Sequence, residues 1–78
     1  MAHQVRWNKI YLEEFIRIGA LNQDEEDVLR LRVAGKSIAQ QASDLGMSIS
    51  KVNVVTRHLK EKYDECQPYS NILPVRNA

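Results

Sequence analysis

The chain contains a single cysteine, Cys66, among its 78 residues. One thiol cannot form an internal disulfide, and no second cysteine or suitably spaced histidine is present to complete a zinc site. We therefore expect Cys66 to be a reduced thiol without a structural bond, and we expect no metal ion.

Groups suited to catalysis are also scarce. The two histidines, His3 and His58, are far apart in the sequence, and neither stands at helical spacing from paired carboxylates or a nucleophile. The three glycines do not form a glycine-rich phosphate loop. A domain of this length has little core with which to support a catalytic cleft. The sequence therefore predicts a protein that is not an enzyme and binds no cofactor.

A long apolar run is missing as well. Hydrophobic residues make up 44% of the chain, but no apolar stretch approaches the length of about 18 residues that spans a membrane. The first residues show no cationic segment followed by an apolar one, as a secretory signal would. We expect one soluble globular domain in the cytoplasm and no association with a membrane.

Charge of one sign does not dominate, because the net charge is only +1. Its distribution is uneven. Residues 1–46 carry six Lys or Arg against seven Asp or Glu, a net of −1, and residues 47–78 carry five against three, a net of +2. Binding to phosphates depends on the number of cations presented, so the second part is the better candidate to meet a polyanion. A solvated helix face would give the same pattern.

Apolar residues at intervals of three and four predict an amphipathic helix over residues 7–18, ending near Gly19. The apolar positions are Trp7, Ile10, Tyr11, Phe15 and Ile18. This stripe suits either a partner surface or a helix that covers the core, and the second interpretation is favoured because so small a domain is short of core.

A second helix is predicted from Asn22 to about Gly35. Asn22 with Glu25 three residues later forms a capping box, in which each side chain satisfies a free amide of the other residue. Four acidic residues fall in or near the first turn, where the helix dipole favours negative charge, so no metal ion is needed to explain them. Depending on the register, the inward face holds either Leu29 and Leu31, or Leu29, Arg32 and Val33.

Residues 37–63 have the features of a helix-turn-helix. Ser37 caps the first helix, with Gln40 at the reciprocal position, and Ile38, Ala42 and Leu45 give its inner stripe. The small side chain of Ala42 permits a close helix crossing, and Gly46 can adopt the positive φ that a sharp turn requires. Ser48 caps a last helix over residues 49–64, in which Val52, Val55 and Leu59 are expected to be buried and Tyr63 to lie at the edge.

Beyond residue 65, two prolines argue against a regular helix and predict an extended tail over residues 66–78. Ile72, Leu73 and Val75 are apolar for a free tail. They can fold back against the first helix, pair with a second subunit, or be disordered. The predicted organisation is a helical domain over residues 1–65, an all-α bundle of about four helices, followed by this irregular tail.

From residue 21 to residue 63 the chain resembles the LuxR-type (GerE) helix-turn-helix domains. The residues that match the spacing of that family are Leu21, Asn22, Glu25, Val28, Leu29, Leu31, Gly35, Ser37, Ala42, Leu45, Gly46, Met47, Ser48, Val52 and Val54. Lys51 and Val55 stand where the family commonly has threonine and histidine, so the DNA sequence preference is not transferred. Prolines replace the helix that often follows in the family. The extra helix before the motif is also similar to region 4 of sigma factors, which we rank second.

The resemblance implies a bacterial-type transcription regulator that places residues 49–64 in the major groove of DNA. The predicted base-reading residues are Ser50, Lys51, Asn53, Val54 and Arg57. All but Lys51 also follow from helical spacing, which puts them opposite the buried valines. The predicted phosphate contacts are Lys36, Ser37, His58, Lys60 and Lys62.

A single small module with few phosphate contacts binds DNA weakly, so we expect a dimer or a larger complex. Trp7, Tyr11 and residues 72–75 are the predicted homodimer interface. The main alternative function is a helix-turn-helix that does not bind DNA and instead docks on RNA polymerase or another regulator.

Overall fold

The computed structural model describes residues 6–75, and this part of the chain is helical without any strand. The helices are α1 (Lys9–Ile18), α2 (Gln23–Val33), α3 (Ile38–Leu45), α4 (Ile49–Cys66) and a 3₁₀ turn, η1 (Gln67–Tyr69). The prediction of an all-α bundle of about four helices is confirmed. His3 and residues 76–78 of the predicted tail lie outside the described residues.

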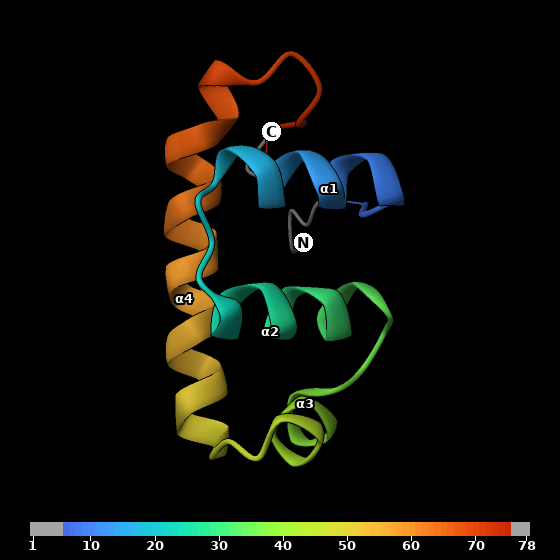
Figure 1. Ribbon diagram of the computed structural model, residues 1–78, viewed down its shortest axis with the longest axis vertical. Coiled ribbons are helices and arrows are strands. Elements are labelled where there is room, and N and C mark those ends of the chain that lie inside the picture. The colour runs from blue at the N-terminus through green and yellow to red at the C-terminus, as the bar shows by residue number, and fades with distance from the viewer. Residues whose placement is uncertain (1–5, 76–78) are drawn as a thin grey trace.

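The longest helix, α4, runs along the length of the molecule (Figure 1). Helices α1 and α2 lie across it one above the other, and α3 packs near its N-terminal end. Each of the three packs against α4, which is therefore the common support of the fold.

The four α-helices begin where short polar side chains accept a hydrogen bond from a backbone amide of the first turn. The capping residues are Asn8, Asn22, Ser37 and Ser48. The cap at Asn8, whose Oδ1 accepts from the Tyr11 amide at 2.8 Å, starts α1 at Lys9 and not at residue 7 as predicted. Local side-chain chemistry therefore fixes the helix starts.

The two predicted reciprocal caps differ in outcome. Asn22 Oδ1 accepts from the Glu25 amide at 2.8 Å while Glu25 Oε1 accepts from the Asn22 amide at 2.9 Å, so the capping box of α2 is complete. At α3, Ser37 accepts from the Gln40 amide, but the Gln40 side chain donates to Asp44 Oδ1 at 2.6 Å. The second half of that box is therefore not formed.

The turn between α3 and α4 has the predicted geometry. Gly46 ends α3 in the left-handed region, with φ 64° and ψ 32°, and the next amide, of Met47, donates to the Ala42 carbonyl at 2.9 Å. Ala42 is buried at the crossing. A residue with a Cβ would be strained at this φ, so glycine allows the sharp change of direction.

A single hydrophobic core joins all four α-helices and the C-terminal segment. Its buried residues are Leu12, Phe15, Val28, Leu29, Ala42, Val52, Val55, Leu59, Tyr63 and Leu73. Three predictions were wrong here. Ile10 is 66% exposed, with Leu12 buried in its place, and Ile38 of the predicted inner stripe of α3 is 38% exposed. Tyr63 is buried and not at the edge. In α2 the buried apolar residues are Val28 and Leu29. Both predicted registers placed Leu29 on the inner face, but neither included Val28.

Three aromatic rings fill the space between α1 and α4. Trp7 stacks on Phe15 with ring centroids 5.9 Å apart, and Tyr63 meets both rings edge-on at 5.8 and 5.2 Å. Edge-on and offset arrangements are the preferred geometries for aromatic pairs. The aromatic residues of the predicted α1 stripe thus serve mainly as core.

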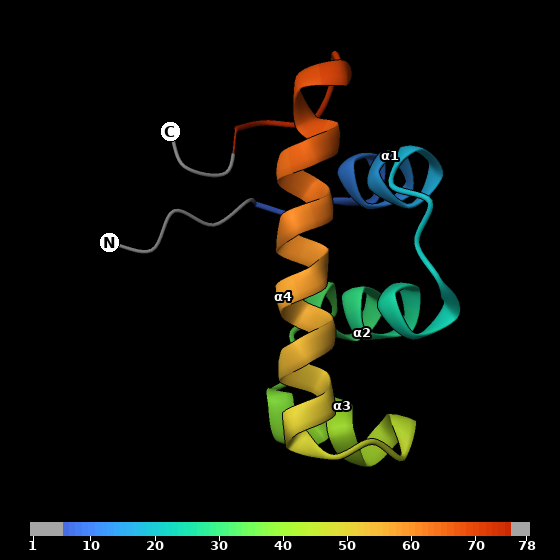
Figure 2. The ribbon, with the colours of Figure 1, turned by 90° about the vertical axis from the view of Figure 1, so that its left-hand side faces the viewer.

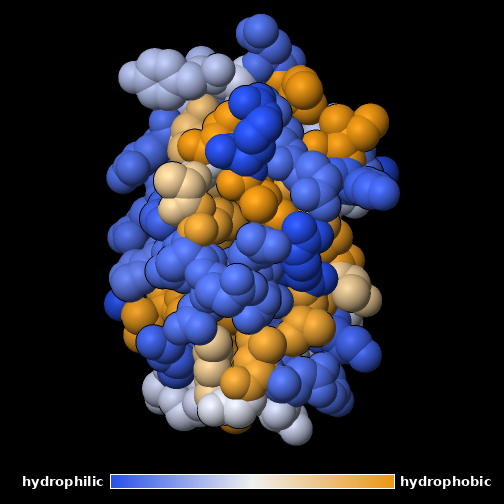
Figure 3. Space-filling view, viewed as in Figure 1, coloured by the Kyte–Doolittle hydropathy of each residue, from blue (hydrophilic) through white to orange (hydrophobic). Residues whose placement is uncertain are grey.

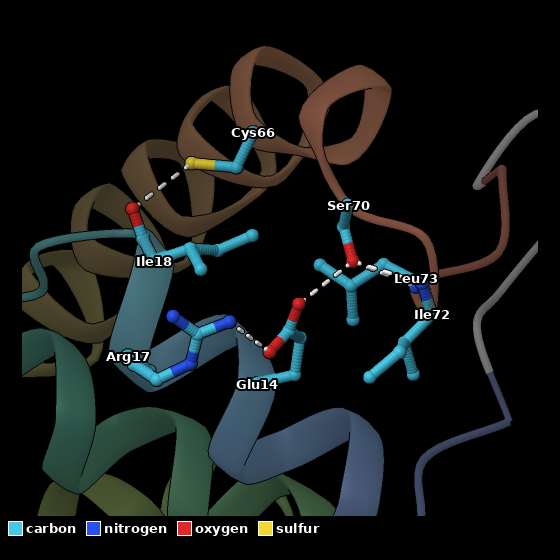
Figure 4. A network of polar contacts seen from close by, with 7 residues as sticks. All are labelled: Glu14, Arg17, Ile18, Cys66, Ser70, Ile72 and Leu73. Atoms are coloured by element: carbon cyan, nitrogen blue, oxygen red, sulfur yellow. Dashed lines mark hydrogen bonds and ion pairs between the residues drawn. The ribbon is translucent and has the colours of Figure 1, made fainter.

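The chain after η1 folds back over α1 as a C-terminal strap, residues 70–75 (Figure 4). Ser70 Oγ donates to Glu14 Oε2 at 2.9 Å and accepts from the amides of Ile72 and Leu73, both at 3.1 Å. Gln67 Nε2 donates to the Leu73 carbonyl at 3.1 Å, and the Tyr63 hydroxyl donates to the Pro74 carbonyl.

Of the alternatives for the tail, the structure shows the fold-back. Leu73 is only 4% exposed and belongs to the core. The predicted boundary after residue 65 falls inside the last turn of α4, which continues to Cys66 because Pro68 interrupts only at η1. The strap therefore shares the hydrophobic core of the helical bundle.

Candidate nucleic-acid interface

One long side of α4 is not covered by the rest of the described chain (Figure 2). The buried residues of this helix are Val52, Val55, Thr56, Leu59 and Tyr63, so that each has another of the set three or four positions away. This spacing turns one face of α4 to the core and leaves the opposite face to solvent. The predicted burial of Val52, Val55 and Leu59 is confirmed.

The predicted base-reading residues all lie exposed on the first half of α4. They are Ser50, Lys51, Asn53, Val54 and Arg57. We call this set the reading face. It combines a hydroxyl, an ammonium, an amide, a guanidinium and an aliphatic group, that of Val54, which is 38% exposed. These groups have the hydrogen-bonding and apolar character needed to contact base edges.

Four of the five predicted phosphate contacts are also exposed. Lys36 and Ser37 stand at the start of α3, and His58 and Lys60 lie on α4 just beyond the reading face. A buried side chain holds the loop before α3 in place. Gln41, which is 1% exposed, donates from Nε2 to the Lys36 carbonyl at 2.8 Å. The prediction missed Gln41, because a glutamine beside Ala42 gives no sign in the sequence that it is buried.

Lys62, the fifth predicted phosphate contact, is only partly exposed and is held in an ion pair. Its Nζ lies 2.6 Å from Glu25 Oε1 and donates to the Ala20 carbonyl at 3.3 Å. Burial alone would raise the pKa of Glu25, but the hydrogen bonds from Lys62 and the Asn22 amide hold it below its usual value. The ammonium of Lys62 thus already has a carboxylate partner that is nearly buried.

Charge changes sign along the exposed side of α4. The exposed cations Lys51, Arg57 and Lys60 precede a stretch in which Glu61, Asp64 and Glu65 are exposed. A polyanion is attracted to the first stretch and repelled by the second. The electrostatics therefore favour contact through the N-terminal part of the helix.

The residues predicted as a dimer interface are divided by the fold. Trp7 packs on the aromatic cluster, Tyr11 is partly buried against the core, and Leu73 is buried, whereas Ile72 and Val75 are 45% and 58% exposed. Figure 3 shows apolar side chains interspersed with hydrophilic ones on one face of the molecule. Ile72 and Val75 are thus the members of the predicted interface that are well exposed.

Cys66 lines a shallow groove of about 510 Å³ together with Ile18, Glu65 and Tyr69. Its thiol lies 3.7 Å from the Ile18 carbonyl, to which it donates. Burial, followed by the charge of Glu65, raises the pKa of Cys66 above its usual value. The thiol is therefore protonated near neutral pH and is a weak nucleophile.

Among the described residues, no group of three or more His, Cys, Asp or Glu side chains is arranged to hold a metal ion. The acidic residues at the start of α2 instead form ion pairs with Lys and Arg side chains and a hydrogen bond with a Gln side chain. None of the helices within residues 6–75 has the length and apolar character to cross a membrane.

Comparison of the chain with protein-family models, with curated proteins and with solved structures found no match. The resemblance to LuxR-type domains, which is based on residue spacing, therefore stays a prediction.

Proposed function

We propose that this protein is a sequence-specific DNA-binding transcriptional regulator that inserts the first half of α4 into the major groove. A helix with its side chains is about 10–12 Å wide and the groove is about 12 Å wide, so the uncovered side of α4 can enter it. The observation that carries the proposal is the reading face, a polar and cationic set exposed beside a tight helix-turn-helix corner.

The chemistry of each side chain suggests its role. Asn53 can make two hydrogen bonds to an adenine edge and Arg57 two to a guanine edge, and Val54 suits a thymine methyl group. Ser50 is too short to specify one base. Lys36, Ser37, His58 and Lys60 would contact phosphates, which position the helix without reading sequence.

The proposal is tested by fluorescence anisotropy with a labelled duplex at two salt concentrations. We expect affinity to fall as salt rises, because binding releases counterions from phosphates. In a duplex selected from a random pool, Arg57→Ala should cost about 1–3 kcal/mol and relax discrimination at one base pair.

Arg17→Ala is the matched control. It removes the same charge from an exposed arginine of α1, on a helix that carries none of the reading face. Equal losses for both variants, or no salt-dependent binding by the unmodified protein, would refute the proposal.

We also propose that DNA binding requires a homodimer, because the four phosphate contacts proposed for one module give weak affinity at physiological salt. Its interface would include the exposed residues Ile72 and Val75 of the strap. Sedimentation equilibrium should show association that is concentration-dependent; a monomer at high concentration would count against it.

A second candidate function is docking of the helix-turn-helix on RNA polymerase or another regulator. It is favoured by three exposed aliphatic residues near the corner: Ile49 is 54% exposed, and Ile38 and Val54 are each 38% exposed. Apolar docking does not depend on phosphate neutralisation, so the salt dependence of duplex binding separates the two functions.

A further inference from the structure

An acidic side chain of α2 lies at the edge of the reading face. Asp24 Oδ2 is 3.7 Å from Lys51 Nζ, and the two side chains are 51% and 52% exposed. Asp24 is in the first turn of α2 and Lys51 in the first turn of α4, so the pair bridges two helices. A carboxylate here occupies a place where DNA phosphates would otherwise meet the lysine.

The neighbouring acids of α2 are directed elsewhere. Glu25 pairs with Lys62 at 2.6 Å, Glu26 with Arg30 at 2.9 Å, and Asp27 accepts from Gln23 Nε2 at 2.8 Å. Within residues 6–75, Asp24 is the acid of this group that contacts a residue of the reading face. Its role therefore differs from that of a capping or framework acid.

We propose that Asp24 is a specificity-determining residue that withholds Lys51 from the phosphates of DNA. This inference rests on the proposed function. When Lys51 leaves Asp24 for a phosphate, the pair is broken and the carboxylate is left facing a polyanion. A sequence that offers Lys51 a base edge can compensate for this loss, whereas other sequences offer only a phosphate. Asp24 thus lowers affinity for non-cognate DNA more than for the cognate site.

The test compares Asp24→Asn with Asp27→Asn in binding to two labelled duplexes, one of random sequence and one selected from a random pool, and the affinity gained by Asp24→Asn should be larger on the random duplex. Both changes keep the side-chain shape and remove one negative charge from α2, and an asparagine at position 27 can still accept from Gln23. Asp24→Asn should bind about two- to fivefold more tightly, the range expected for an exposed ion pair. The slope of log affinity against log salt should steepen by up to about 0.9, the value for one additional phosphate contact. Asp27→Asn should change affinity by less than about twofold.

A double-mutant cycle with Lys51→Gln isolates the contact. In the Lys51→Gln background, Asp24→Asn should have no more effect than Asp27→Asn, because the lysine that it would release is absent. All measurements are made where circular dichroism shows every variant to be folded.

Four results would overturn the inference: equal effects of the two acidic variants, an equal gain by Asp24→Asn on the random and the selected duplex, tightening by Asp24→Asn that survives in Lys51→Gln, or weaker binding by Asp24→Asn. In each of these cases the unmodified protein still binds DNA, so the proposed function stands. If the unmodified protein binds no duplex, the proposed function itself fails and this inference fails with it.

Discussion

The Glu25–Lys62 ion pair joins the start of α2 to the C-terminal half of α4. The Glu25 side chain is 4% exposed and that of Lys62 is 33% exposed, with 2.6 Å between Oε1 and Nζ. The same carboxylate completes the α2 capping box. Two hydrogen bonds thus compensate for the desolvation of one buried charge.

Glu25→Gln should lower the free energy of unfolding by about 1–3 kcal/mol at pH 7, since it removes one partner of a buried charged pair. The loss stays moderate because Lys62 can still reach solvent. Urea unfolding measures the change. Glu61→Gln, at an exposed position of α4, is the control and should change stability by less than about 0.5 kcal/mol.

This contribution should depend on pH. The pKa of Glu25 is lower in the folded protein than its ordinary value of 4.5, so the stabilisation is present above that value. It is lost as the pH falls through the lower folded-state pKa, where the carboxyl becomes protonated in the native state. The stability difference between the unmodified protein and Glu25→Gln should therefore shrink as the pH falls from neutrality to values below 4.5. A difference that stays constant over this range would contradict the assignment.

The roles of single residues are predictable from sequence where their partners are local. The caps at Asn22, Ser37 and Ser48 bond to amides three residues on, so the pattern was sufficient. The partner of Lys62 is 37 residues away, and only the packing of α2 on α4 brings the two together. The sequence pattern alone does not show this partner, and it predicted a phosphate contact for Lys62.

Among the elements, the turn between α3 and α4 depends on backbone conformation and not on space. A Cβ at position 46 would meet nothing within 4 Å, but the φ of +64° is strained for L-residues. Gly46→Ala should destabilise the protein by about 1 kcal/mol, whereas Gly46→Asn, which tolerates this region better, should cost less. Thermal unfolding of both variants checks the order. An alanine variant as stable as the unmodified protein would contradict the geometry.

The strap holds α1 on α4 through one buried side chain and several hydrogen bonds. Leu73→Ala should cost about 2–4 kcal/mol of unfolding free energy, because Leu73 is buried in the core. Val75→Ala, at an exposed position of the same segment, should cost less than about 0.5 kcal/mol.

Hydrogen exchange adds a local readout of the strap. Amides of α1 should exchange faster in Leu73→Ala than those of α3, because the strap contacts α1 through Ser70 and Glu14. Equal stability of Leu73→Ala and Val75→Ala would show that the strap is not part of the core.

The elements also show where periodicity is insufficient. In α1 both Ile10 and Leu12 are apolar. Apolar residues spaced three or four positions apart can be chosen so that they include Ile10 or so that they include Leu12, and the two choices are equally regular. The aromatic contacts with Tyr63 and the strap decide the rotation of α1, and Leu12 is buried as a result. A tertiary contact of this kind is not encoded in the spacing of α1 alone.

In the whole molecule, α4 has two distinct faces along its length. Its inner face contacts each of the other helices, and its outer face is left open along one side (Figure 2). The fold class, the helix-turn-helix corner and the exposure of the reading face could be predicted from sequence, since they follow from caps, one glycine and helical spacing. The fold-back of the strap could not be predicted. Pairing with a second subunit and disorder are equally compatible with the prolines and apolar residues of this segment.

The position of bound DNA is best determined by an NMR titration of the nitrogen-labelled protein with a duplex selected from a random pool, repeated at higher salt. The largest amide shift changes should fall within residues 48–60 and near Lys36 and Ser37, and they should diminish as salt rises. Changes confined to α1 and the strap, with α4 unaffected while the duplex is bound, would show that the uncovered side of α4 is not the DNA-binding surface.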